Sequence, residues 1–417
     1  METSVSASPL ALFEGYGIEI EYVIADAETL DVRAIADRVI EAECGAVLND
    51  VARGAFAWSN ELARHLIEIK TSVPARSLSG LADGFAGEVA RIDAHLAPHG
   101  ARLLSTAMHP WMEPLREFAL WPHGDAEIYA AFDRIFDCRG HGWANLQSAQ
   151  LNLPFANDDE FGRLHAAARA LLPLLPALAG ASPFVEGRHV GLLDTRLDVY
   201  RHNSARIPSL AGAVVPEPIF TRADYCALLD SLYVDLAPHD PDRTLCHEWV
   251  NARGAIARFD RMALEIRVLD VQECPRADLA IAWAVSGTLE ALCDPAAAHQ
   301  ARLRSLATQP LAELFARTTA QAEQAVVEDA ELLRALGLDP GARSAREVWR
   351  ALFERHLASD PGAAEHGAAI EVMLEEGCLA RRILRRVGEK PPREALAALY
   401  RELGECLRAG RLLRAST

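Results

Sequence analysis

The sequence predicts an α+β fold, and two kinds of pattern support that class. Short alternating or apolar segments predict strands in the first two-thirds of the chain. Beyond about Asp278, leucine and alanine recur at helical spacing with charged residues between them, which is typical of amphipathic helices. The predicted strands are residues 15–24, 66–71, 148–154 and 262–271.

Helices are predicted between these strands from the same periodicity. Residues 32–43 and 78–96 have helical spacing, and a proline and a glycine follow the second segment. Residues 158–178 predict one long helix that contains Pro173 and Pro176.

The C-terminal third is predicted to be helical throughout. Residues 371–386 and 393–413 are its clearest amphipathic segments, and two prolines at 391–392 separate them. No linker divides the chain, so we expect a catalytic α+β body over residues 1–300 and a helical part over 301–417 that packs on the same core.

Composition sets the class of protein. Half of the 417 residues are hydrophobic and 24% are charged, which is ordinary for a globular protein with a large core. The formal net charge of −17 argues against a general nucleic-acid partner, because such proteins present basic surfaces. No apolar run approaches the ~20 residues that a membrane span requires, and residues 1–9 lack a signal-peptide pattern. We therefore expect a cytoplasmic protein that acts on small molecules, without a nucleic-acid or membrane partner.

The eight cysteines are scattered and contain no C-x-x-C pair. This usage is typical of reduced cytosolic thiols and differs from a disulfide framework or a zinc site. The apolar C-terminal helices would allow a homo-oligomer, and the oligomeric state stays open.

The first predicted strand carries two glutamates. Glu19 and Glu21 are two residues apart, so their side chains leave the same face about 7 Å apart. Charges this close repel each other, and a divalent cation such as Mg²⁺ or Mn²⁺ would remove the repulsion. A solvated outer face of an antiparallel sheet explains the same pattern without a ligand.

Three further segments repeat this feature, each with a pair of polar residues in or beside an apolar strand. The pairs are Glu61 and Glu68, Gln150 and Asn152, and Glu265 and Arg267. Four strands that each present polar residues predict a polar-lined sheet that holds a charged ligand.

Activation of a carboxylate by ATP suits such a surface. The carboxylates would hold metal ions against the phosphates, and guanidinium groups would stabilise the transferring phosphoryl group. Arg267, Arg196 and Arg201 are candidates for phosphate or a substrate carboxylate, and Arg267 is the one embedded in a strand. The chain has no P-loop, and residues 15–17 precede a strand and therefore do not form a dinucleotide fingerprint.

Five segments in order resemble the glutamate–cysteine ligases, in particular family 2, the bacterial carboxylate–amine ligases. The first is the G-x-E-x-E strand at residues 17–21. The others are residues 60–74 (NELARHLIEIKTSVP), 179–187 (AGASPFVEG), 251–260 (NARGAIARFD) and 264–275 (LEIRVLDVQECP). The similarity runs from about residue 13 to about residue 300.

The resemblance implies a glutamine-synthetase-type catalytic fold, a curved and mainly antiparallel sheet that holds ATP and two or three Mg²⁺ or Mn²⁺ ions on its concave face. It implies a set of metal ligands, which are Glu19, Glu21, Glu61, Glu68 and Glu265. It also places Arg267 near the phosphates, so Glu265 and Arg267 become the catalytic candidates.

The resemblance extends to nucleotide and substrate contacts. Gln150 and Asn152, together with Arg267, are candidates for the nucleotide. Residues 194–203 resemble the family's substrate-side loop, which puts Arg196 and Asn203 near a substrate carboxylate, with Arg201 as a further candidate.

One position departs from the family pattern. Gln150 stands where many relatives carry a histidine of an H-x-H or H-x-N segment. An amide oxygen ligates Mg²⁺, but more weakly than imidazole binds softer ions. The ligand set and the substrate therefore stay open. His141 is a candidate replacement, and a structural or solvent-facing loop histidine is the alternative.

Taken together, these patterns predict an ATP-dependent carboxylate–amine ligase. The leading hypothesis is a γ-glutamyl ligase that acts through an acyl phosphate, with glutamate and cysteine as the leading pair and another amino acid, amine or peptide terminus left open. The alternatives are a family member that binds nucleotide or metal without ligase activity, with Gln150 as its sign, and a metal-dependent hydrolase on the same carboxylates.

Overall fold

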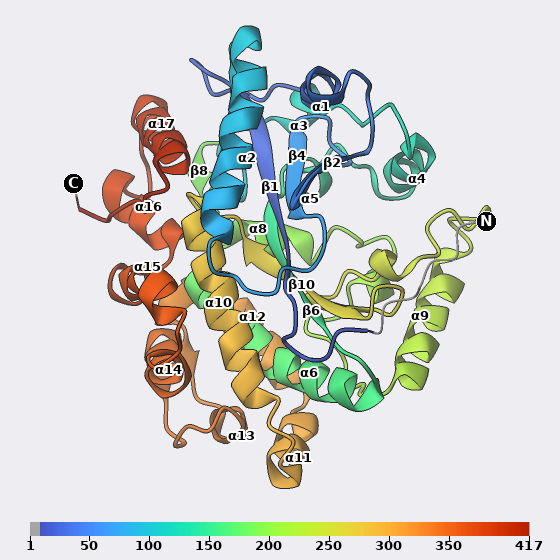
Figure 1. Ribbon diagram of the computed structural model, residues 1–417, viewed down its shortest axis with the longest axis vertical. Coiled ribbons are helices and arrows are strands. Elements are labelled where there is room, and N and C mark those ends of the chain that lie inside the picture. Colours follow the sequence, from blue (N-terminus) through green and yellow to red (C-terminus); the bar gives the residue numbers. More distant parts are fainter. Residues whose placement is uncertain (1–8, 417) are drawn as a thin grey trace.

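A twisted antiparallel sheet of eight strands forms the centre of the protein (Figure 1). The computed structural model describes residues 9–416. The strands follow the order β2-β3-β4-β1-β6-β10-β9, and β5 pairs with the end of β1. Their bounds are β1 Gly17–Asp26, β2 Asp50–Arg53, β3 Phe56–Asn60, β4 Leu66–Thr71, β5 Ala101–Leu104, β6 Ser148–Pro154, β9 Ala255–Arg258 and β10 Ala263–Asp270. The mainly antiparallel sheet confirms the predicted fold class.

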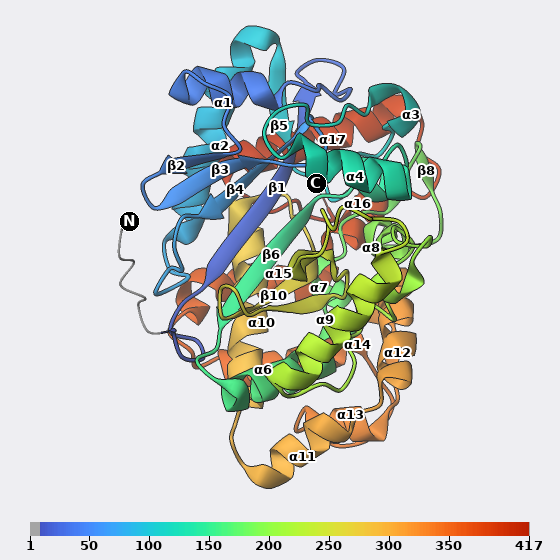
Figure 2. The ribbon, with the colours of Figure 1, turned by 90° about the vertical axis from the view of Figure 1, so that its right-hand side faces the viewer.

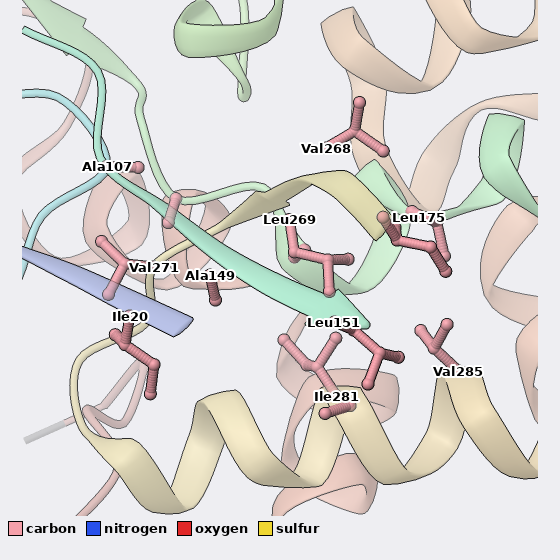
Figure 3. Close-up of a cluster of buried hydrophobic side chains, with 14 of the residues drawn as sticks. Ile20, Ala107, Ala149, Leu151, Leu175, Val268, Leu269, Val271, Ile281 and Val285 are labelled. Carbon is pink, nitrogen blue, oxygen red and sulfur yellow. The ribbon is translucent and has the colours of Figure 1, made fainter. Parts of the chain in front are cut away.

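One face of the sheet is apolar and packs against two long helices, α2 (Leu81–Leu96) and α10 (Pro275–Leu292). Figure 3 shows Ile20 of β1 in the same cluster as Ile281 and Val285 of α10. These side chains are buried, and burial of an aliphatic side chain contributes about 1.5–3 kcal/mol to folding. The apolar residues of each strand therefore fix which face turns away from the helices.

The polar residues of four strands gather on the opposite face. In an antiparallel pair, directly opposite residues point to the same side of the sheet. The opposed residues are Glu21 with Glu68, Glu19 with Lys70 and with Gln150, and Glu265 with Asn152. This register confirms the prediction of a single polar-lined face.

A β-bulge interrupts β10. Ile266 pairs with Leu151 and Leu269 pairs with Ala149, so two residues of β10 oppose Gln150 alone. A bulge adds one residue to a strand and changes which later residues face each side. Leu269 consequently lies in the apolar core.

Further helices surround the sheet, and Figure 2 shows α4, α8 and α9 on the side opposite to α10. In the first three-quarters of the chain they are α1 Ala36–Cys44, α3 Pro114–Glu117, α4 Ala126–Phe136, α5 His141–Ala144, α6 Asp158–Leu171, α7 Pro176–Ala179, α8 Thr195–Tyr200 and α9 Arg222–Leu236. A short hairpin of β7 (Phe184–Val185) and β8 (Arg188–His189) lies between α7 and α8.

The C-terminal part is mainly helical and shares the core of the body. Its helices are α11 Ala297–Ser305, α12 Thr308–Gln321, α13 Ala330–Ala335, α14 Ala345–Leu352, α15 Ala363–Glu376, α16 Leu379–Val387 and α17 Arg393–Ala409. A two-stranded ladder of β11 (Val326–Val327) and β12 (Arg343–Ser344) joins them. One cluster of buried apolar residues runs from Ile18 to Leu413, and the buried pair Glu273–Arg382 links the segment between β10 and α10 to α16.

Two predicted helices are wrong in their extent. The helix predicted over residues 158–178 stops at Leu171, and a 3₁₀ turn and α7 follow, because prolines at 173 and 176 lack the N–H that a continuous helix needs. The segment 371–386 divides into α15 and α16 at Gly377, whose φ of 91° no helix accommodates.

Candidate active site

Three carboxylates meet on the polar face of the sheet. Glu21 comes from β1, Glu68 from β4, and Glu61 follows β3 directly. One oxygen of each lies within 4.8 Å of the others. Mg²⁺ and Mn²⁺ prefer carboxylate oxygens, so this group has the donor set of a divalent-cation site.

Neutral donors hold Glu21 in place. The backbone N–H of Ser148 donates to one oxygen at 2.8 Å, and the Ser148 hydroxyl donates to the other at 3.1 Å. Nε2 of Gln150 also donates to Glu21, at 3.0 Å. Gln150 therefore positions this carboxylate by hydrogen bonding, at the position where the family resemblance implies a histidine.

Lys70 compensates part of the charge of Glu68. The Lys70 ammonium lies 3.4 Å from Glu68 and 2.7 Å from Asp50. The Ser59 hydroxyl donates to Glu68 at 2.7 Å.

The carboxylates around Glu68 lack comparable compensation. In the part of the chain that the structure describes, no lysine or arginine forms an ion pair with Glu19, Glu21 or Glu61. Burial and the charge of Glu68 raise the pKa of Glu21 from its ordinary value of 4.5 to about 7. Burial and neighbouring carboxylates likewise raise the pKa of Glu61 and of Glu19 well above the usual range. A divalent cation would supply the missing positive charge, so the residues fit such an ion.

Two arginines enclose Glu265, at the other end of the polar face. Its carboxylate lies 3.1 Å from Arg258 and 2.7 Å from Arg267. Burial alone would lower the pKa of Arg267, but Glu265 raises it, so this guanidinium is a fixed cation. Glu19 lies between the two ends and accepts a hydrogen bond from Asn152 at 3.0 Å.

A second fixed cation comes from α8. Arg196 is 2% exposed, and its Nε donates to the fully buried Asp270 of β10. Burial would lower the pKa of Arg196, but Asp270 and Asp194 raise it. The Ser182 hydroxyl donates to the other oxygen of Asp270 at 2.9 Å, which fixes the direction of the pair.

A cavity of about 330 Å³ lies above these groups. This volume is at the lower end of the ~300–1,000 Å³ range of ligand pockets. The predicted site residues that line it are Glu21, Glu61, Gln150, Arg196, Asn203 and Arg267. Aromatic residues of α4, α5 and a 3₁₀ turn also line the cavity.

The remaining predicted residues lie elsewhere. Glu19, Glu68, Asn152 and Glu265 share the polar face of the sheet but do not line the cavity. Arg201 is exposed, pairs with Asp198 at 3.0 Å, and also lies outside the lining.

His141 does not line the cavity either, although its neighbour Gly142 does. Its Nδ1 lies 3.1 Å from the Asn145 amide, and its Nε2 lies 3.5 Å from Glu186.

Several site residues were missed in the sequence. Ser148 begins a predicted strand beside Gln150, but a serine there carries no signal. Asp270 is acidic at the end of an apolar strand, which is the same signal that marked Glu265. Tyr200 falls inside the substrate-side loop and lines the cavity with a buried hydroxyl that has no partner among residues 9–416.

Comparison with known proteins assigns the family. The family model described as glutamate–cysteine ligase family 2 matches residues 16–402. The chain belongs to this family. As a family 2 member it is an ATP-dependent ligase, and the resemblance seen in the sequence is confirmed over nearly the whole chain.

Relatives and a solved structure extend this assignment. This chain is 33% identical over 391 residues to an uncharacterized protein of Archaeoglobus fulgidus. The aligned region covers 94% of this chain and 98% of that one. The chain is 30% identical over 186 residues to a Pseudomonas aeruginosa protein named "Putative glutamate--cysteine ligase 2", which covers 43% of this chain and 45% of that one. A crystal structure of glutamate–cysteine ligase from Francisella tularensis in complex with AMP matches with a TM-score of 0.56. At 12% identity, and with 94% of this chain and 89% of that chain covered, this match shows the fold alone.

Among residues 9–416, no helix combines the length and the apolar character needed to cross a bilayer. All eight cysteines are free thiols.

Proposed function

We propose that the chain uses ATP to activate the side-chain carboxylate of glutamate and joins it to an amine. One observation carries the proposal. Carboxylates that lack a counter-charge and two fixed guanidinium groups line the same cavity. The family assignment and the names of the relatives support glutamate as the carboxylate.

The reaction has two steps. A carboxylate oxygen of glutamate attacks the γ-phosphorus of ATP, and ADP leaves with the electron pair of the bridging oxygen. The nitrogen of the amine then attacks the acyl carbon, phosphate leaves, and the nitrogen loses a proton. Both steps place negative charge beside the reacting atoms, which preorganised cations stabilise.

Each group of the cavity has a role in this scheme. Arg267 would stabilise the transferring phosphoryl group, because its guanidinium is held in the site by Glu265. Arg196 would bind the α-carboxylate of glutamate, with Tyr200 and Asn203 beside it. Glu21, Glu61 and Glu68 would hold Mg²⁺ or Mn²⁺, with Glu19 and Glu265 along the same face. Such an ion neutralises phosphate charge and orients the γ-phosphate.

The nucleotide would lie along the sheet. Gln150 and Asn152 of β6 lie on its polar face, and Glu265 opposes Asn152 across the strand pair. ATP would bring Mg²⁺ with it, so the acidic side chains would attract the nucleotide through the ion instead of repelling its phosphates.

The test is release of ADP and phosphate from MgATP by the purified protein, with amino acids and amines supplied singly and in pairs. We expect release that requires glutamate together with an amine, and a γ-glutamyl product by mass spectrometry. Nucleotide binding without phosphate release in every mixture would instead indicate a family member without ligase activity. Phosphate release that needs no ATP would indicate a hydrolase.

A further inference from the structure

Three aromatic residues, called the aromatic wall below, line the same cavity as the polar sheet face, called the floor. The wall consists of Phe132 of α4, Trp143 of α5 and Trp249 of the 3₁₀ turn before β9. The ring centroid of Phe132 lies 5.0 Å from that of Trp143 and 5.7 Å from that of Trp249. Two separate connections of the fold thus meet at Phe132, in the lining of the cavity.

This wall differs from a buried aromatic cluster elsewhere in the protein. Phe155, Phe161, Tyr225 and Phe259 also pack ring to ring, with centroids 5.1–5.8 Å apart, and all four are buried. The three wall residues are only half-buried and line a cavity. Packing alone accounts for the first cluster, whereas the wall leaves ring surface open to a ligand.

The wall carries no charge. The charged residues that line the cavity are Glu21, Glu61, Arg196 and Arg267, which belong to the floor and to α8. The rest of the cavity lining includes apolar residues such as Leu62 and Leu210. A ligand group that contacts the wall gains by being apolar, because a charged group there would lose its hydration without a partner.

The position of the wall identifies which substrate it would contact. The amine nitrogen must approach the acyl carbon to about 3–3.5 Å, so its substituents occupy space next to the floor. The adenine of ATP is separated from the γ-phosphorus by the ribose and two further phosphates. The polar face of the sheet continues past the cavity lining to Glu19, Asn152 and Glu265, so a nucleotide laid along this face would extend beyond the cavity that the wall lines.

Resting on the proposed function, we infer that the amine substrate carries a bulky apolar or aromatic group, which packs on Phe132, Trp143 and Trp249. The wall selects the amine by surface contact, and the floor binds the glutamyl acyl phosphate. The small thiol side chain of cysteine would leave most of this wall uncovered.

The first experiment compares amines at saturating MgATP and glutamate. The probes are L-phenylalanine, L-cysteine and L-alanine, and kcat/KM is measured from ADP release and from the γ-glutamyl product. We expect phenylalanine to exceed alanine and cysteine by about tenfold or more, since even one methylene in a hydrophobic pocket contributes about 10-fold or more. Cysteine or alanine as the best amine would overturn the inference and leave the proposed ligase intact.

The second experiment uses Phe132→Ala, with Phe132→Leu as the conservative variant. Phe118→Ala is the matched control, because Phe118 is a half-buried phenylalanine of the same β5–β6 connection and does not line the cavity. We expect Phe132→Ala to reduce the preference for phenylalanine over alanine to about threefold or less, with the KM for ATP within about twofold of wild type. Phe132→Leu should recover part of the preference, and Phe118→Ala should keep it. A raised KM for ATP with an unchanged amine preference would assign the wall to adenine and overturn the inference.

A binding measurement separates this inference from the proposed function. If no amine gives glutamate-dependent ADP release, the proposed function fails. Calorimetric titration with phenylalanine and alanine then still tests the wall, through an affinity for phenylalanine at least about tenfold higher in the wild type and not in Phe132→Ala. Equal affinities in the wild type, or a preference that survives in Phe132→Ala, would overturn the inference.

Discussion

The two ends of the polar sheet face treat charge differently. Around β1 and β4, Glu21 is held by neutral donors, and the pKa values of Glu21 and Glu61 are raised. Around β9 and β10, Glu265 is buried between Arg258 and Arg267. At the first end the carboxylates repel one another, whereas at the second end the carboxylate is neutralised by arginines of the protein.

This difference teaches what each end is built to receive. Buried charges persist only when they are paired or bound to a metal, so the first end requires a cation from outside. The second end presents a preformed guanidinium with no further requirement. The same chemical type, glutamate on a strand, therefore predicts ligand binding at one end and positioning of arginine at the other.

The largest effect should follow from Glu21→Gln. The change keeps the shape of the side chain but removes a charge from the carboxylate group, so we expect ADP release to fall by more than about 100-fold, beyond the 10–100-fold typical of residues that only support metal ligands. Rates at varied Mg²⁺, with circular dichroism as a check on folding, measure this. Glu28→Gln, in the exposed turn after β1, is the control. Near-normal turnover would remove Glu21 from the metal site.

Stability should respond in opposite ways at the two ends. Glu265→Gln removes the negative charge that pairs with Arg258 and Arg267, which are buried or half-buried. The free energy of unfolding should therefore fall by about 3 kcal/mol. Glu21→Gln relieves repulsion and should not lower the free energy of unfolding of metal-free protein. Urea denaturation in the presence of a chelator tests both variants. An equal loss in the two would erase the distinction between the ends.

The pH dependence of metal-free protein should report the first end. Because the pKa of Glu21 is raised in the folded state, the folded protein binds more protons than the unfolded chain between pH 4.5 and about 7. Glu21 therefore lowers stability as pH rises through this window, by about 3 kcal/mol in total. The buried histidines His65 and His109, whose pKa burial lowers to about 4, act in the opposite direction in the same range. The difference between wild type and Glu21→Gln reports Glu21 together with its effect on the pKa of Glu61, and added Mg²⁺ should reduce this difference. A pH-independent difference would contradict the shifted pKa.

The smallest effect should come from Gln150→Ala. Its amide donates to Glu21 at 3.0 Å, so its loss frees the carboxylate to rotate and should weaken apparent Mg²⁺ affinity by about tenfold. Asn152→Ala, which removes the corresponding donor to Glu19, is the comparison for the middle of the face. Magnesium titration of ADP release measures both. No change in Gln150→Ala would leave that side chain with a role in packing alone.

Much of the fold follows from the sequence because the strands are locally distinct. β4 and β6 occupy the predicted residues 66–71 and 148–154, since alternation and turn residues mark both ends of each. The long helix over 158–178 failed because periodicity continued through Pro173 and Pro176, which interrupt the backbone hydrogen bonds.

The site was predictable where strand register alone decides it. Polar residues two apart on a strand must share a face, which brings Glu21 toward Glu68 and Glu19 toward Gln150 once the strands pair. Loop and helix positions carry no such constraint. Arg201 and Arg196 lie five residues apart in the same segment, but only Arg196 turns into the cavity. Phe132 and Trp249 are far apart in sequence, and only the folded connections bring them together.

The bulge makes the geometry of the site depend on the number of residues in β10. With the extra residue between Ile266 and Leu269, Arg267 and Asp270 both reach the polar side although they are three positions apart. Without the bulge, plain alternation from Ile266 would turn Leu269 to the polar side and Asp270 toward the layer of α10, away from Arg196. We therefore expect the number of residues between Ile266 and Leu269 to matter as much as the identity of Arg267 and Asp270.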